Sequence, residues 1–195
     1  MNLSSRWCVT AAIALGALSC SDPVPPPAQG AFNVSLTSVS PPNGKQCPTG
    51  AATSFDVPSV YATGKLTEVL TTNTYLHSSI DGEGDAKVSC SVKGSSSFTF
   101  SGRIAAQGRV LELSDGVLSN NMTGTARVMV TDSAKLSSAL TSPAADCTIK
   151  VVNNTKGVQV KSGSLWAEFT CASVEHQPAD GCGAKGVFVF ENCTE

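Results

Sequence analysis

Residues 85–104, DAKVSCSVKGSSSFTFSGRI, predict a β-hairpin and decide the fold class. Val88, Cys90 and Val92 alternate with polar residues, so all three side chains fall on one face of an extended strand. The turn-forming residues Gly94 to Ser97 then separate this strand from a second alternating segment. The pattern predicts two antiparallel strands, each with one apolar face.

The same alternation recurs along the rest of the chain. Further strands are predicted at residues 32–37, 53–57, 110–113, 123–131, 147–151, 165–171 and 187–192. Asp115-Gly116, a strong turn dipeptide, is expected to end the 110–113 strand. Residues 187–192 are apolar on both faces, which is typical of a central strand. The sequence therefore predicts an all-β fold, an antiparallel β-sandwich of about eight to ten short strands stapled by disulfides.

The strongly apolar run at the N-terminus predicts an export signal over residues 1–19. Arg6 supplies a positive charge, and the apolar segment from Trp7 to Leu18 is shorter than the roughly 20 residues that a membrane span needs. The run ends at Ala17-Leu18-Ser19-Cys20, which resembles the bacterial lipobox. In lipoproteins of that family the Cys thiol receives a diacylglycerol and becomes the acylated N-terminus after cleavage. Simple secretion, with ordinary cleavage before Cys20, is the alternative.

The number of cysteines separates these two alternatives. The chain has eight, of which Cys8 leaves with the signal and Cys20 ends the lipobox. An odd cysteine in an exported protein needs an explanation, and lipidation of Cys20 supplies one. The remaining six are expected to form structural disulfides in an oxidising compartment: Cys47, Cys90, Cys147, Cys171, Cys182 and Cys193. Lipidation is therefore the favoured interpretation.

The pairing of the six cysteines stays open. A hairpin of residues 147–152 and 164–171 would bring Cys147 near Cys171, but a bridge from Cys171 to Cys182 fits equally well. A structural zinc site would need cysteine pairs in C-x₂₋₄-C spacing. The closest pairs after the signal are eleven residues apart, which favours disulfides over zinc.

Residues 20–30 are predicted to be the acylated Cys followed by a proline-rich linker. Pro23 and the run Pro25 to Pro27 favour extended polyproline II conformation. Such a linker would hold the following domain about 20–30 Å from the membrane. Residues 31–195 have the length of a single domain.

Charge narrows the classes of partner. The chain carries 13 Lys and Arg against 15 Asp and Glu, without a basic cluster. Nucleic acid is therefore not expected as a partner, and there is no polybasic segment to bind anionic lipid head groups. The expected partners are the membrane, through the lipid at Cys20, and a protein or glycan. No cofactor is expected.

One loop resembles the beginning of a calcium site. Asp81, Glu83 and Asp85 place carboxylates at alternate positions between glycines, as in the first ligands of an EF-hand loop. The pattern then fails, because Ala86 and Val92 stand where that loop needs Gly and a bidentate Glu. A solvated connecting loop is favoured, and a metal site is the weaker alternative.

Catalytic residues are not predicted. The chain has two histidines, His77 and His176, both in expected loops, and no serine lies in a G-x-S-x-G elbow. We therefore expect a protein that is not an enzyme, with an envelope hydrolase as the least favoured alternative.

Trp166 is the one candidate binding residue. It falls on the face of its strand opposite Leu165 and Ala167. An exposed Trp on a sheet is a common platform for sugar or protein contact. Burial under a second layer is the commoner role in sandwiches and is favoured here. A small-ligand or carbohydrate-binding domain that uses Trp166 or the 81–85 loop is thus the runner-up function.

Two longer motifs carry a resemblance to a known group of proteins. Residues 162–193 contain SGSLWAEFTC, a loop with Pro, Gly and Cys, and then GVFVFENC, and residues 88–94 read VSCSVKG. Together they resemble small envelope lipoproteins of myxobacteria and related bacteria. The resemblance implies a β-rich envelope lipoprotein and no catalytic residue. We therefore expect a lipid-anchored protein of the outer membrane, on its periplasmic or surface face, with a structural or interaction role.

Overall fold

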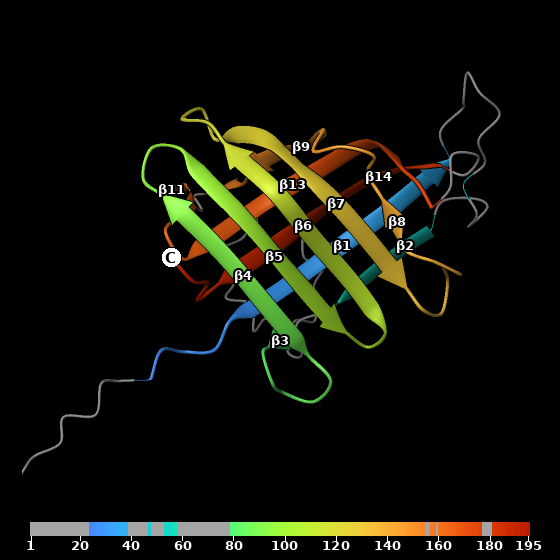
Figure 1. The fold of residues 1–195 in the computed structure, drawn as a ribbon, viewed down its shortest axis with the longest axis horizontal. Coiled ribbons are helices and arrows are strands. Elements are labelled where there is room, and N and C mark those ends of the chain that lie inside the picture. Colours follow the sequence, from blue (N-terminus) through green and yellow to red (C-terminus); the bar gives the residue numbers. More distant parts are fainter. Residues whose placement is uncertain are drawn as a thin grey trace, which may run out of the picture.

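The computed structural model describes residues 24–38, 47, 53–57, 79–154, 157–158, 160–176 and 181–195, which form strands and connecting segments without a helix (Figure 1). The strands are β1 (Gln29–Ser38), β2 (Thr53–Val57), β3 (Ser79–Ile80), β4 (Lys87–Gly94), β5 (Phe98–Ala106), β6 (Arg109–Leu118), β7 (Thr123–Asp132), β8 (Leu140–Thr141), β9 (Cys147–Val151), β10 (Asn153–Asn154), β11 (Gly157–Val158), β12 (Val160–Lys161), β13 (Ser164–Val174) and β14 (Cys182–Glu191). In this part of the chain, no helix has the length and hydropathy that a membrane crossing requires.

One antiparallel sheet contains most of these strands, in the order β2-β1-β14-β13-β9-β7-β6-β5-β4. Three short strands join it at the side, with β12 on β13, β3 on β1 and β8 on β7, and β10 pairs with β11 separately. The all-β, antiparallel fold class predicted from the sequence is confirmed.

The hairpin predicted over residues 85–104 is β4 and β5. Its register pairs Val88 with Ile104 and Gly94 with Phe98. The apolar residues of β4 are buried, and the polar residues between them are exposed or half-buried. The burial pattern therefore follows the sequence alternation residue by residue.

The sheet curls so that β4 to β7 lie across β1, β13 and β14 (Figure 1). The ring of Phe100 on β5 stacks on that of Phe188 on β14, with the centroids 6.3 Å apart. A Cβ atom on Gly102 would lie 2.5 Å from the ring of Phe190, so glycine permits this close approach. The two layers expected of a sandwich are thus two halves of one curled sheet, rather than separate sheets.

Strand β14 lies in the interior of this sheet, as its apolar pattern predicts. It pairs with β1 on one side and β13 on the other. Phe188 and Phe190 point into the main core, while Val187 and Val189 form a second buried cluster on the opposite face. Burial on both faces explains why this strand does not alternate between apolar and polar residues.

The predicted end of a strand at Asp115-Gly116 is wrong. β6 continues past this dipeptide to Leu118. Asp115 adopts a left-handed φ of 53°, and the pairing of β6 with β7 shifts between Ser114 and Val117. The turn-forming dipeptide therefore makes a β-bulge, which bends the strand without ending it.

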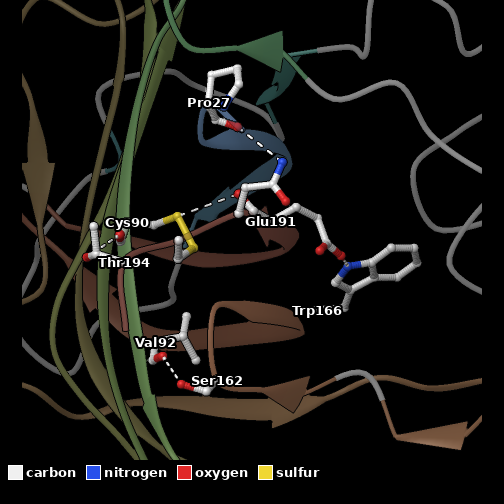
Figure 2. Close-up of a disulfide and its surroundings, with 9 residues drawn as sticks. Pro27, Cys90, Val92, Ser162, Trp166, Glu191 and Thr194 are labelled. Atoms are coloured by element: carbon white, nitrogen blue, oxygen red, sulfur yellow. Dashed lines mark hydrogen bonds between the residues drawn. A yellow bond between two sulfur atoms is a disulfide. The ribbon is translucent and has the colours of Figure 1, made fainter. Parts of the chain in front are cut away.

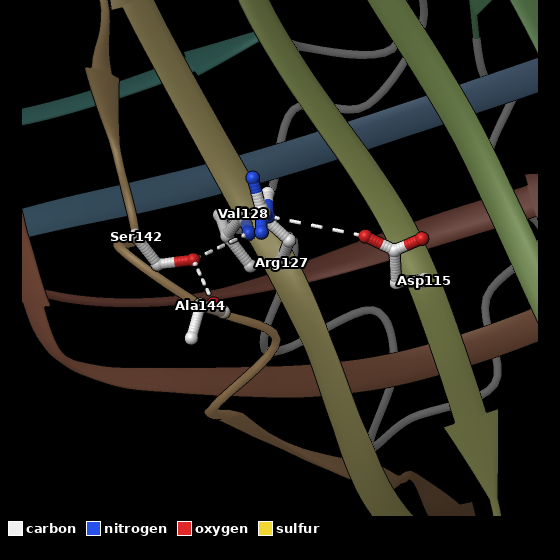
Figure 3. Close-up of polar contacts among 5 residues, drawn as sticks. All are labelled: Asp115, Arg127, Val128, Ser142 and Ala144. Atoms are coloured by element: carbon white, nitrogen blue, oxygen red, sulfur yellow. Dashed lines mark hydrogen bonds and ion pairs between the residues drawn. The ribbon is translucent and has the colours of Figure 1, made fainter.

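Ser142 fills a gap beside β7 (Figure 3). β9 pairs with β7 as far as Ala126, and β8 begins to pair at Met129, so Val128 has no strand residue opposite it on that side. The backbone N–H of Ser142 donates to the carbonyl of Val128 at 2.8 Å, and its hydroxyl accepts from the N–H of Val128 at 3.0 Å. That hydroxyl also donates to the carbonyl of Ala144 at 2.8 Å. Ser142 thus satisfies both backbone groups of Val128.

Three disulfides staple the fold, as predicted, and all six cysteines are buried. The bridges are Cys47–Cys182, Cys90–Cys193 and Cys147–Cys171. The structure therefore selects the Cys147–Cys171 pairing that the sequence left open. The two cysteines lie opposite each other on adjacent antiparallel strands, one position beyond the pair formed by Thr148 of β9 and Thr170 of β13.

The described residues cover the start of the β domain but not the predicted export signal. β1 begins at Gln29, two residues before the predicted domain start at residue 31. The predicted export signal, the lipobox with Cys20, most of residues 59–80 and His77 lie outside the described residues.

Candidate functional site

Residues 191–194, which we call the C-terminal segment, bring β4, β13 and the linker together (Figure 2). Cys193 is bonded to Cys90 of β4. The N–H of Thr194 donates to the carbonyl of Cys90 at 3.0 Å, and the N–H of Val92 donates to the carbonyl of Thr194 at 3.1 Å. The C-terminal segment therefore runs along the edge of β4 as a short parallel partner.

Other groups occupy the rest of this strand edge. The N–H of Val88 donates to a carboxylate oxygen of Asp81 at 2.9 Å. The carbonyl of Val92 accepts from the N–H of Gly163 at 2.9 Å. It also accepts from the hydroxyl of Ser162 at 3.3 Å (Figure 2). An edge whose polar groups are satisfied in this way is closed to pairing with another chain.

The linker is attached to the same segment. The side-chain amide of Asn192 donates to the carbonyl of Pro27 at 3.1 Å (Figure 2). Asn192 adopts a left-handed φ of 55°, which asparagine tolerates better than most residues. Residues 24–27 are exposed, so this hydrogen bond fixes the direction in which the chain leaves the domain.

Trp166 is half-buried rather than fully exposed. Its indole N–H donates to the carboxylate of Glu191 (Figure 2). Its ring packs against the cluster formed by Val187 and Val189, together with Val152. Both the polar and the apolar parts of the side chain are thus engaged inside the protein.

The acidic loop is a turn held by its own carboxylates. Asp81 accepts from the N–H of Val88, and Asp85 accepts from the N–H of Gln107 at 2.6 Å. Glu83 is exposed. In the described ranges, no three His, Cys, Asp or Glu residues gather closely enough to hold a metal ion. Two of the three carboxylates of the loop are therefore engaged in hydrogen bonds within the protein.

A groove of about 740 Å³, which we call the serine groove, lies on the outer face of β4, β5 and β6. The side chains on its floor are Ser89, Ser91, Ser101, Arg103, Glu112 and Ser114. One wall is formed by the linker and the C-terminal segment, through Pro25, Pro26, Asn192 and Thr194. The groove therefore lies where the chain enters the domain.

Strand register arranges the floor of the serine groove. Ser91 lies directly opposite Ser101, and Arg103 lies between Ser89 and Glu112 on the neighbouring strands. The Nε atom of Arg103 is 3.5 Å from a carboxylate oxygen of Glu112, and these side chains are 43% and 42% exposed. Among the described residues, the four serine hydroxyls have no hydrogen-bond partner. The floor thus offers hydroxyls and one balanced ion pair to a bound molecule.

His176, a described candidate residue, does not line this groove. It is exposed and follows Glu175, whose backbone bridges to Thr141. His77 and Cys20 lie outside the described residues.

Sequence patterns alone do not identify the serine groove or the linker contact. Serines at alternate strand positions resemble any solvated sheet face, and Asn192 resembles any residue after a strand. The sequence offers one signal for the groove, which is the short side chain of serine at three outward positions where long charged residues are common: Ser89, Ser91 and Ser101. Short side chains leave room above the sheet.

Comparison with known proteins gives no family for this chain. No family model, curated protein or solved structure matches it. A functional assignment therefore depends on the residues of the chain and their geometry, because a fold alone does not imply a function.

Proposed function

We propose that this chain is a lipoprotein of the bacterial cell envelope, anchored through an acylated Cys20, whose β domain has a non-enzymatic structural or interaction role. The pairing of cysteines carries the proposal. Six of them are joined to one another within the fold. Removal of the signal takes Cys8, which leaves Cys20 of the lipobox-like tetrapeptide without a partner in the mature chain.

Acylation of Cys20 supplies sufficient binding energy for a stable anchor. Each buried CH₂ group contributes about 0.8 kcal/mol, and two chains are needed for stable attachment. The diacylglycerol that lipoproteins carry at this position meets that requirement. We infer an outer-membrane location, on the periplasmic or surface face.

The geometry of the linker supports a short tether. Pro27 is held by Asn192, and seven residue steps separate Pro27 from Cys20. In polyproline II conformation these steps cover about 20 Å. Because Pro25 and Pro26 border the serine groove, a chain anchored at Cys20 would keep this groove near the membrane.

The serine groove supports an interaction role rather than a catalytic one. A serine nucleophile requires a base within hydrogen-bond reach. The described residues that line the groove include the serines, one arginine–glutamate pair and two prolines, and none of them is a histidine. Its polar groups are therefore suited to hold a molecule by hydrogen bonds.

Substitution of the lipobox cysteine tests the anchor. In the full-length precursor, we expect Cys20→Ala to move the protein from the washed membrane fraction to the aqueous fraction. Cys8→Ala is the matched control, since it also removes a signal-region cysteine, and should leave the protein in the membrane fraction. Retention of the Cys20→Ala protein in the membrane fraction at the level of the unmodified chain would refute the anchor.

A further inference from the structure

We propose that the serine groove binds a neutral glycan chain through hydrogen bonds to its hydroxyl groups. The floor combines four serine hydroxyls, each of which can donate and accept, with the donors of Arg103 and the acceptors of Glu112. A sugar ring presents the same mixture of donors and acceptors along its edge. The groove and a polyhydroxylated ligand are therefore complementary in hydrogen bonding.

The charge of the groove selects a neutral ligand. Arg103 and Glu112 are the charged side chains of its lining, and they form an ion pair with each other. A phosphate or a polyanionic chain would need uncompensated basic residues, which this lining does not provide. The balanced pair thus favours an uncharged polyol.

A peptide ligand fits less well. Peptides commonly bind such folds by adding a strand to a sheet edge. At the edge of β4, Val88, Cys90 and Val92 already bond to Asp81, Thr194 and Gly163. The floor also lacks the exposed aromatic or large aliphatic anchor that protein interfaces use.

The proposed glycan site does not include Trp166. The indole N–H of Trp166 is bonded to Glu191, and its ring packs on Val187 and Val189. Stacking of a sugar on this ring would require the side chain to leave that cluster. The serine groove needs no rearrangement of this kind.

The size and position of the groove fit a short stretch of polysaccharide. Ligand sites commonly measure about 300–1,000 Å³, and this groove measures about 740 Å³. The source of the glycan rests on the proposed anchor, because a tether of about 20 Å keeps the groove among envelope polysaccharides. The chemistry of the groove does not depend on the anchor.

Titration of the mature, full-length protein with neutral tetrasaccharides tests the site. The probes are linear tetramers of glucose and of N-acetylglucosamine, with a galacturonate tetramer as the anionic comparison, in a detergent without sugar groups. We expect at least one neutral tetramer to bind with a Kd of about 1 mM, and the anionic tetramer to bind more weakly. Backbone NMR shifts should change in β4, β5 and β6.

A blocking variant and its control make the test specific. Ser101→Leu fills the floor of the groove and should weaken binding at least about tenfold. Thr148→Leu makes a comparable apolar change at an exposed position of β9, outside the groove, and should leave binding unchanged. The fluorescence of Trp166 should not respond to the glycan.

Four outcomes would overturn the glycan site. They are the absence of binding by every neutral tetramer, undiminished binding by Ser101→Leu, tighter binding of the anionic tetramer, and shifts centred on Trp166. Mass analysis of the same sample reports acylation of Cys20 separately. Failure of the glycan site and failure of the anchor are therefore distinguishable.

Discussion

The disulfide between Cys90 and Cys193 joins β4 to the residues after β14 across a sequence separation of 103 residues. β4 is the last strand of the curled sheet, and the residues next to Cys193 hold the linker and Trp166. This single bond therefore connects one end of the sheet to the point where the chain enters the domain.

Loss of this disulfide should cost more stability than loss of the Cys147–Cys171 bridge. Chain-entropy arguments give about 4.7 kcal/mol for a loop of 103 residues and about 3.5 kcal/mol for one of 24 residues. Unfolding by denaturant of the paired variants Cys90→Ser/Cys193→Ser and Cys147→Ser/Cys171→Ser measures both values. A larger loss of stability in the Cys147→Ser/Cys171→Ser variant would contradict the expectation that the longer loop contributes more.

Ser142→Ala should destabilise the fold by about 1–3 kcal/mol, because it leaves the buried N–H of Val128 without an acceptor. Ser137→Ala, at an exposed position in the connection before β8, is the control and should change stability by less than about 0.5 kcal/mol. Equal unfolding free energies for the two variants would show that the backbone groups of Val128 are satisfied in another way.

Gly102→Ala should destabilise the fold by about 1–3 kcal/mol through overpacking. The added Cβ would lie 2.5 Å from the ring of Phe190, at the contact between the two halves of the sheet. Ser101→Ala changes the outer face at the neighbouring position and should be nearly neutral. Thermal melting compares them, and an unchanged melting temperature in Gly102→Ala would argue against this close contact.

Asn192→Gly should release the linker without harming the domain. Glycine accepts the left-handed φ of 55° but has no amide to donate to Pro27. Hydrogen exchange should therefore accelerate in peptides that cover Ala28 to Gly30, while peptides from β5 stay unchanged. Unchanged exchange near Ala28 would mean that the hydrogen bond of Asn192 does not hold the linker.

Local alternation predicted much of this fold because burial follows a period of two along each strand. The β4–β5 hairpin with its buried Cys90 and the central position of β14 came from that pattern. The curl of the sheet could not be predicted from local patterns, because it depends on contacts between residues far apart in sequence, such as Phe100 and Phe188.

Local patterns gave a wrong prediction where the same residues suit two backbone conformations, a turn and a bulge. Asp115-Gly116 has the composition of a turn, yet both residues lie in a bulge within β6, because the pairing with β5 and β7 continues on either side. Ser142 and Asn192 act through single side chains on distant backbone groups. Such contacts leave no periodic signal in the sequence.

Mass spectrometry of the mature protein, purified without reduction, examines the anchor and the disulfides in one sample. We expect Cys20 as the N-terminal residue, carrying a diacylglycerol, and we expect peptide mapping to find the six cysteines of the fold paired as in the structure. A mature chain with a free thiol at Cys20, or with Cys20 in a disulfide, would contradict the proposed anchor.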